Sequence, residues 1–312
     1  GDIMQKKKRK KRRVKIKLKT KNFIIFIIFI ILIIFGTAKL MSFILKNVDT
    51  HKNKNEVIDK INNKKEDTEK EKKLKELNNI NKKVKYFKMD NLDRYINYKN
   101  KNPDKEIKQI IKDVNMDLDK EPYEDMIKAT NLNSINILVN KHNYLTEDYV
   151  PENLENINSS YALSNMKMVS EAKNAFENLS KAAAKQNLKV IAMSTYRSYE
   201  YQVDLYNRYV KTDGKETADT YSGRPGNSEH QTGLAVDVYN VKESYTNFEK
   251  TKEYTWMQDN AYKYGFILRF PKDKENETGY EFESWHYRYV GLEAAKYIKE
   301  HNISFEEYCA IN

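Results

Sequence analysis

Two short stretches of the chain each place a histidine close to a carboxylate. The first reads NSEHQTGLAVDV and holds His230 and Asp237, seven positions apart around one glycine. The second reads ESWH and places Glu283 three positions before His286. The chain of 312 residues has only five histidines, so two of them lying close to acidic residues indicates a possible chemical role. Histidine nitrogens and carboxylate oxygens are common ligands of catalytic zinc ions, so the two stretches suggest a metal site.

A catalytic zinc site typically has three protein ligands and keeps a fourth position for water. We therefore expect His230, Asp237 and His286 to converge on one metal ion. The glycine and small residues between the first two allow a tight turn that folds the histidine back towards the aspartate. Glu283 is then placed by sequence to take a proton from water that the metal has acidified. Spacing alone is a weak signal, because a lone histidine on a strand more often has a purely structural role.

Around these stretches, hydrophobic periodicity predicts helices and strands in an irregular order. Such a mixture favours an α+β domain over a repeating βαβ sheet. Gly265 is expected to end one of the helices, because glycine is the usual residue just past a helix C-terminus. The predicted strands cover residues 136–139, 188–193, 233–238, 266–270 and 285–290. The predicted helices cover residues 103–114, 162–186, 198–211, 254–264 and 292–300.

The N-terminal part of the sequence has the pattern of a membrane anchor. Thirteen apolar residues, FIIFIIFIILIIF, run without a break from Phe23 to Phe35, and further apolar residues extend the stretch to residue 45. A helix of this length spans the hydrocarbon core of a bilayer, which is about 30 Å thick. Basic residues massed before it predict a cytoplasmic N-terminus and an extracytoplasmic remainder. A cleavable signal peptide is the alternative, because Gly36 and Ala38 are spaced like a cleavage site.

The net charge of +11 comes entirely from the first 22 residues, which hold twelve Lys or Arg and one acid. The rest of the chain is balanced, with 44 basic and 44 acidic residues. The basic block therefore belongs with the membrane segment that follows it and does not indicate a nucleic-acid partner. The single cysteine, Cys309, excludes an intrachain disulfide and any zinc site built from several cysteines.

The sequence divides into four segments. Residues 1–22 form a cytoplasmic basic segment, 23–45 a transmembrane anchor, 46–85 a polar spacer and 86–312 a zinc domain. The spacer is rich in Lys, Glu and Asn and nearly free of aromatic residues, so it cannot bury enough surface to offset its conformational entropy. Aromatic residues return after the spacer and stay dense to the end of the sequence, which marks the folded part.

Three blocks of this sequence resemble a known family of peptidases. SEHQTGLAVD (228–237) and ESWH (283–286) are similar to the S-x-H-x-x-G-x-A-x-D and E-x-W-H signatures of VanY-type D-alanyl-D-alanine carboxypeptidases. STYRSYEYQ (194–202) resembles the family's S-G-Y-R-S…Q segment. These zinc peptidases form a group with the LD-carboxypeptidases, the VanX-like dipeptidases and the zinc-binding domain of Hedgehog. The resemblance implies a Hedgehog/D-Ala-D-Ala-peptidase-like α+β domain, with a small antiparallel sheet flanked by helices.

The resemblance also implies the metal chemistry of the site. Zn²⁺ would be held by His230, Asp237 and His286. Glu283 would act as the general base and then donate the proton to the leaving amine. Arg197 would bind polar groups of the substrate and the oxyanion that develops at the scissile carbonyl, where a fixed positive charge is most effective.

Hydrogen bonds to the terminal residue of the substrate are implied for Ser228 and Gln202. The sequence departs from the family pattern at two positions, with Thr195 where glycine is common and Ser284 where proline is common. Neither departure removes a metal ligand or the base, although both lie beside residues of the site.

The function implied by the resemblance is a membrane-anchored, extracytoplasmic zinc carboxypeptidase that acts as a monomer on peptidoglycan. It would remove the terminal D-Ala from stem pentapeptides, which would also favour tolerance of glycopeptide antibiotics. The nearest alternative is an LD-carboxypeptidase that acts on tetrapeptide stems. A second alternative is a non-catalytic, zinc-containing wall-binding module. The presence of Glu283 and Arg197 favours an enzyme, because zinc binding alone needs neither residue.

Overall fold

The structure, a computed structural model, describes residues 84–312, which all lie in one compact unit running from Lys75 to Asn312. The predicted basic segment, the anchor at 23–45 and nearly all of the spacer lie outside the described residues. Between residues 84 and 312, no helix has both the length and the apolar character needed to cross a membrane.

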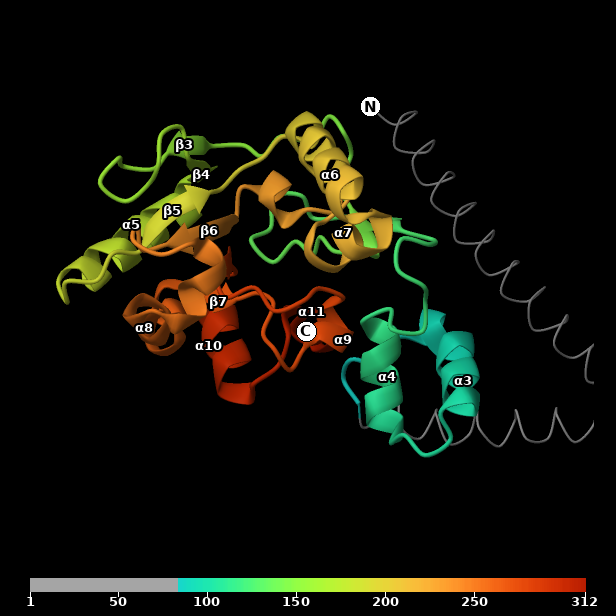
Figure 1. The fold of residues 1–312 in the computed structure, drawn as a ribbon. Coiled ribbons are helices and arrows are strands. Elements are labelled where there is room, and N and C mark those ends of the chain that lie inside the picture. Colours follow the sequence, from blue (N-terminus) through green and yellow to red (C-terminus); the bar gives the residue numbers. More distant parts are fainter. Residues whose placement is uncertain (1–83) are drawn as a thin grey trace, which may run out of the picture. The chain divides into compact units, whose positions relative to one another are not determined.

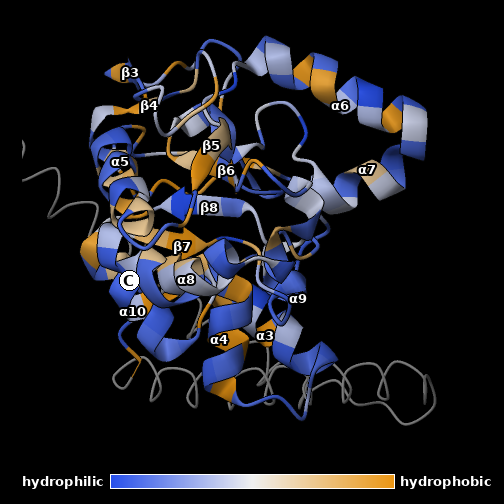
Figure 2. Ribbon diagram, turned by 60° about the vertical axis from the view of Figure 1, so that its left-hand side comes forward, coloured by the Kyte–Doolittle hydropathy of each residue, from blue (hydrophilic) through white to orange (hydrophobic). Residues whose placement is uncertain are grey.

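A four-stranded antiparallel sheet forms the centre of the domain (Figure 1), with the strand order β5-β6-β8-β7, which can be followed in Figure 2. Side chains of the inner strands β6 and β8 are buried on both faces of the sheet, except at the end of β6. Figure 2 shows that β8 is hydrophilic, although it lies between the more hydrophobic strands β6 and β7. The strands are β5 (Ile191–Ser194), β6 (Ala235–Tyr239), β7 (Phe266–Leu268) and β8 (His286–Tyr289).

The apolar faces of two helices complete the main core beside this sheet. From α5 (Ser170–Ala184), the ring of Phe176 packs edge-on against Phe266 of β7, with ring centroids 6.0 Å apart. Residues of α8 (Lys252–Asn260) join the same core. Full burial of a side chain as large as phenylalanine contributes roughly 1.5–3 kcal/mol, so these contacts hold the helices on the sheet.

Two further helices lie apart from α8 and α10 in both views (Figures 1 and 2). The first, α6 (Tyr199–Asp213), begins where the side chain of Ser198 accepts a hydrogen bond from the backbone N–H of Tyr201, 3.2 Å away. Such an N-cap satisfies one of the free N–H groups at a helix start. The second is α7 (Lys215–Tyr221), which packs on α6. Because α6 follows β5 closely, the residues between them lie next to the sheet.

The remaining elements surround this core. One smaller core joins α10 (Leu292–His301) to α11 (Phe305–Ile311), and another joins α3 (Leu92–Lys101) to α4 (Ile107–Asn115). Four short strands form two pairs, parallel for β1 and β2 and antiparallel for β3 and β4. These strands and the short helices are β1 (Ile127–Lys128), β2 (Asn143–Tyr144), β3 (Leu154–Asn156), β4 (Lys167–Val169), α9 (Glu275–Thr278), η1 (Met89–Asn91), η2 (Glu229–Thr232), η3 (Tyr245–Lys250) and η4 (Ala261–Tyr264).

The predicted α+β class, with a small antiparallel sheet flanked by helices, is confirmed. The predicted strand at 136–139 is wrong, because these residues form a loop, with Ile137 and Val139 buried, that pairs with no strand within residues 84–312. The helix predicted from residue 162 starts only at Ser170, since residues 167–169 pair with β3 instead. The helix predicted from residue 103 starts at Ile107. Gly265 ends η4 with a φ of +80°, as the sequence predicts.

Candidate active site

Three elements bring the predicted metal ligands together. Asp237 of β6 pairs directly with His286 of β8 in the register of the sheet, and η2 carries His230. One ligand atom from each of the three residues lies within 4.8 Å of the others. The Nε2 atom of His230 is 3.3 Å from Oδ2 of Asp237, and Nδ1 of His286 is 3.0 Å from Oδ1. Residues 56 positions apart in sequence therefore form one buried cluster.

The turn between the first two ligands depends on Gly233. This residue ends η2 in the left-handed region, with a φ of +69°, which glycine adopts without strain. A Cβ atom at this position would lie only 2.9 Å from Cδ2 of Leu154. The turn leads the chain from His230 directly into β6, so the predicted role of this glycine agrees with the structure.

The hydrogen bond of His230 leaves one of its ring nitrogens available to bind a metal ion. The backbone carbonyl of Thr195 lies 2.6 Å from Nδ1 of His230 and accepts its hydrogen, which leaves the Nε2 lone pair facing Asp237. Among residues 84–312, this buried Nε2 atom has no hydrogen-bond partner. Two imidazoles and a carboxylate form the donor set of a catalytic zinc site, so the residues present fit Zn²⁺ as the cofactor.

The charges in the cluster favour the protonation states that a metal requires at Asp237 and His230. Burial raises the pKa of Asp237, but the neighbouring His230 and His286 outweigh it and hold that pKa well below its usual range. Burial, together with the nearby Arg197, lowers the pKa of His230 to about 4. Asp237 is therefore ionised and His230 neutral at pH 7, as ligands of a metal ion must be.

Glu283 lies beside the cluster, and its carboxylate accepts no hydrogen bond from the described residues. Its Oε2 atom is 3.7 Å from Nδ1 of His286, and within residues 84–312 no hydrogen bond to this carboxylate is found. Burial raises the pKa of Glu283 to about 8 in the metal-free site. A carboxylate with a raised pKa, no fixed partner and access to a cavity has the properties of a general base.

Arg197 lies between the end of β5 and the start of α6. Its Nη2 atom is 3.7 Å from Oδ2 of Asp237, and its Nη1 atom donates a hydrogen bond to Oε1 of Gln202 at 3.2 Å. The side-chain nitrogen of Gln202 in turn donates to the backbone carbonyl of Gly223 at 2.7 Å. Gln202 is buried and therefore positions Arg197, while its predicted contact with substrate stays a prediction.

One cavity of about 600 Å³ joins all seven predicted site residues. Ser228 lines it with a side chain for which no hydrogen bond is found within the described part of the chain. Aromatic side chains that the sequence analysis did not single out form much of the remaining wall. They are Tyr201, Tyr209, Tyr221, Tyr245, Phe270, Tyr280 and Trp285. The cavity is large enough for a short peptide segment, and its polar groups gather at the metal cluster.

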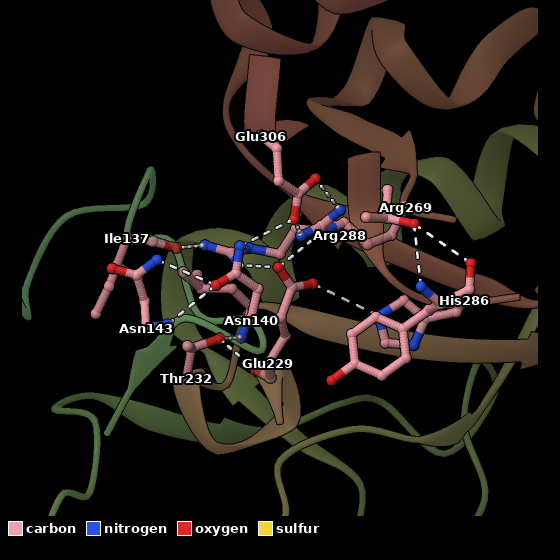
Figure 3. Close-up of polar contacts among 12 residues, drawn as sticks. Ile137, Asn140, Asn143, Glu229, Thr232, Arg269, His286, Arg288 and Glu306 are labelled. Carbon is pink, nitrogen blue, oxygen red and sulfur yellow. Dashed lines mark hydrogen bonds and ion pairs between the residues drawn. The ribbon is translucent and has the colours of Figure 1, made fainter. Parts of the chain in front are cut away.

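A group of buried charges next to His286 was also missed by sequence reasoning (Figure 3). It consists of Glu229, Arg269, Arg288 and Glu306. The only sequence signal was an arginine within each of two otherwise apolar or aromatic strands, FILRF and WHYRYV. A charge at a buried strand position needs a partner, but the sequence does not show which one.

The fold, the metal cluster and the free carboxylate define the protein as a metal-dependent peptidase. The family described as VanY, D-alanyl-D-alanine carboxypeptidase, matches residues 165–292. A putative carboxypeptidase, YodJ of Bacillus subtilis, is 39% identical over 204 residues, which cover 61% of this chain and 75% of that protein. The chain belongs to the VanY family of carboxypeptidases. This membership argues against the non-catalytic wall-binding module.

Other similar proteins include carboxypeptidases of two specificities. A D-alanyl-D-alanine carboxypeptidase of Enterococcus faecalis is 36% identical over 181 residues, which are 55% of this chain and 64% of that relative. The LdcB LD-carboxypeptidase structure is 37% identical, with a TM-score of 0.57 over 61% of this chain and 92% of that chain. The chain thus spans less than two thirds of the enterococcal enzyme but nearly all of the LdcB structure.

Proposed function

We propose that the protein is a zinc-dependent D,D-carboxypeptidase that removes the terminal D-Ala from peptidoglycan stem pentapeptides. The observation that carries this proposal is the convergence of His230, Asp237 and His286 beside a carboxylate with no hydrogen-bond partner in the described chain. The match to the VanY family of D-alanyl-D-alanine carboxypeptidases and the similarity to the enterococcal D-alanyl-D-alanine carboxypeptidase support this substrate.

Each residue of the site has a separate role in the proposed hydrolysis. When bound, zinc would act as a Lewis acid, which polarises the scissile carbonyl and lowers the pKa of water so that a base can take its proton. Glu283 takes the proton from the attacking water and passes it to the leaving amine of the terminal D-Ala. Arg197, 3.7 Å from Asp237, places its positive charge beside the carbonyl oxygen as that oxygen becomes negative.

The cavity wall orients the end of the peptide. Ser228 offers a free hydroxyl to a polar group of the terminal residue. Gln202 supports this arrangement by fixing Arg197 through a hydrogen bond at 3.2 Å. The apolar faces of the aromatic wall exclude water from the peptide backbone, which strengthens the polar contacts at the metal.

An LD-carboxypeptidase acting on tetrapeptide stems is the second candidate. It is supported by the similarity to the LdcB structure, because the matched region covers 92% of the LdcB chain. Release of D-Ala from defined penta- and tetrapeptides by the purified protein, with and without zinc, tests both candidates. Release from the pentapeptide supports the first proposal, and release from the tetrapeptide alone would overturn it in favour of the second.

We also propose that the enzyme works outside the membrane and is held there by the segment at residues 23–45. Support comes from the sequence, where a block of basic residues precedes an apolar stretch. Membrane fractionation with protease protection of the catalytic domain tests this arrangement. Degradation of the domain by protease added outside intact cells is expected, and full protection would contradict it.

A further inference from the structure

A network of four buried charges lies next to His286 (Figure 3). Two carboxylates, Glu229 and Glu306, alternate with two guanidinium groups, Arg269 and Arg288. Each of the four side chains is at most 3% exposed. Removing charges from water is unfavourable even when they are paired, so a buried network of this kind is weak evidence for stability. Its position at the metal site suggests a functional role.

The two oxygens of Glu229 face in different directions. Oε1 accepts hydrogen bonds from Nε of Arg269 at 2.8 Å and from Nη1 of Arg288 at 3.0 Å. Oε2 faces Nε2 of His286 at 3.6 Å, which is an ion-pair distance slightly longer than a hydrogen bond. Within the described part of the chain, both Oε2 of Glu229 and Nε2 of His286 otherwise lack a hydrogen-bond partner. The network thus aims one free carboxylate oxygen at the back of a metal ligand.

The groups around Glu229 leave its carboxylate little freedom to turn. Arg269 also binds both oxygens of Glu306, one of them at 2.8 Å. Arg288 donates to two backbone carbonyls, Ile135 at 2.9 Å and Ile137 at 2.8 Å. The loop at 136–139, predicted as a strand, therefore serves to hold Arg288. With both arginines fixed, Oε2 of Glu229 stays directed at the imidazole.

The opposite side of the His286 imidazole carries the nitrogen that faces the metal cluster. Its Nδ1 atom is 3.0 Å from Asp237, so the ring turns Nδ1 to the cluster and Nε2 to Glu229. The ring of Phe270 lies over this imidazole, with centroids 4.9 Å apart and planes at 30°. A metal-bound histidine needs its second N–H to be held by an acceptor, which fixes both the tautomer and the ring orientation.

We propose that Glu229 is a positioning residue for the metal, which accepts the Nε2–H of His286 and so directs the Nδ1 lone pair at the ion. The proposal rests on the proposed function in so far as zinc binds at His286. Glu229 precedes the ligand His230 in sequence but acts on the other histidine ligand in space. Arg269, Arg288 and Glu306 hold its carboxylate in place.

Glu229→Gln tests this role, and Glu306→Gln is its matched control. Each substitution removes one buried carboxylate charge from the same network, but only Glu229 reaches His286. The zinc dissociation constant of the full-length protein is measured by competition with a chelator, beside thermal unfolding of the zinc-free forms. We expect both variants to unfold at lower temperature. We expect zinc binding to weaken by about 10- to 100-fold in Glu229→Gln, and much less in Glu306→Gln, which loosens Arg269 but leaves the carboxylate that faces His286.

Equal weakening of zinc binding in both variants would assign Glu229 a structural role only and overturn the proposal. Unchanged affinity in Glu229→Gln would overturn it as well. If Glu229→Gln does not fold, the zinc dissociation constants of Glu229→Asp and Glu306→Asp are compared instead. Each of these substitutions keeps the negative charge but shortens the side chain by one methylene group. Zinc binding by the unchanged protein is measured in parallel, so a failure of the proposed function itself would be recognised separately.

Discussion

Asp237 and His286 face each other across neighbouring antiparallel strands, with Oδ1 of the first 3.0 Å from Nδ1 of the second. Backbone hydrogen bonds of β6 and β8 therefore set the spacing of two proposed metal ligands. Only His230 arrives from outside the sheet, and the carbonyl of Thr195 next to β5 fixes its ring. Sites built on strands hold their geometry better than sites on loops. We expect zinc to bind with little movement of these side chains.

The first prediction concerns the metal ligands. His286→Ala removes one of three ligands, and we expect the purified protein to lose most of its zinc and its peptidase activity. His301→Ala is the matched control, because His301 is exposed on α10 and is not part of the cluster. Metal analysis of both variants checks the prediction. Full zinc occupancy in His286→Ala would show that the ion binds elsewhere.

The second prediction concerns the general base. Glu283→Gln keeps the shape of the side chain but cannot take a proton, so we expect kcat to fall by about 10²- to 10⁴-fold with zinc retained. Glu281→Gln serves as the control, since Glu281 lines the same cavity but makes no ion pair with the cluster within the described residues. Steady-state D-Ala release and zinc content are measured together. A kcat close to that of the unchanged enzyme would remove Glu283 from this role.

The third prediction concerns Arg197. Loss of one preorganised donor to a developing oxyanion typically lowers kcat by about 10²- to 10³-fold, and we expect this effect for Arg197→Ala. Arg208→Ala, on the exposed side of α6, should leave kcat unchanged. Kinetics with the pentapeptide substrate provide the comparison. An increase in KM alone would indicate that Arg197 binds ground state and transition state equally well.

The parts of this site that could be predicted from the sequence are those that lie in short, recognisable motifs. Residue types and spacing make His230, Asp237, His286 and Glu283 candidates for ligands and a base, and their roles come from the resemblance of the surrounding motifs to the VanY family. The glycine turn at Gly233 is predictable for the same reason. The structure brings all of these together, while their roles in catalysis stay predictions.

The parts that sequence did not predict depend on distant contacts. The apolar loop 136–139 has the composition of a strand, but it finds no strand to pair with and instead supplies a carbonyl to Arg288. Likewise, the pairing of Arg269 with Glu229 and Glu306 joins residues about 40 positions apart. Local propensity contains no information about such partners, so only the folded chain reveals them.

The fourth prediction concerns the core that supports the site. Phe176 is fully buried against Phe266 of β7, so Phe176→Ala leaves a cavity beneath the sheet. We expect the free energy of unfolding to fall by about 3–5 kcal/mol. Leu292→Ala, at a position that is 61% exposed, should change it far less. Chemical denaturation of the zinc-free protein measures both, and a small loss for Phe176→Ala would mean that the core repacks around the gap.

The fifth prediction concerns protons released when zinc binds. Burial lowers the pKa of His286, but the contacts with Asp237 and Glu229 outweigh it and raise that pKa to about 9 in the metal-free protein. The raised pKa stabilises the metal-free fold, an effect complete below about pH 6.5 and lost as the pH rises through about 9. Below pH 9, zinc must displace a proton from this ring.

Zinc binding at pH 7 is therefore expected to release at least one proton, and zinc affinity is expected to fall as the pH is lowered from 9 to 6. His230 adds little to this release, because its pKa of about 4 keeps it neutral over the same range. Calorimetric titration in buffers of different ionisation enthalpy counts the protons released. A binding enthalpy independent of the buffer at pH 7 would contradict the prediction, since it would show that His286 is already neutral before the metal arrives.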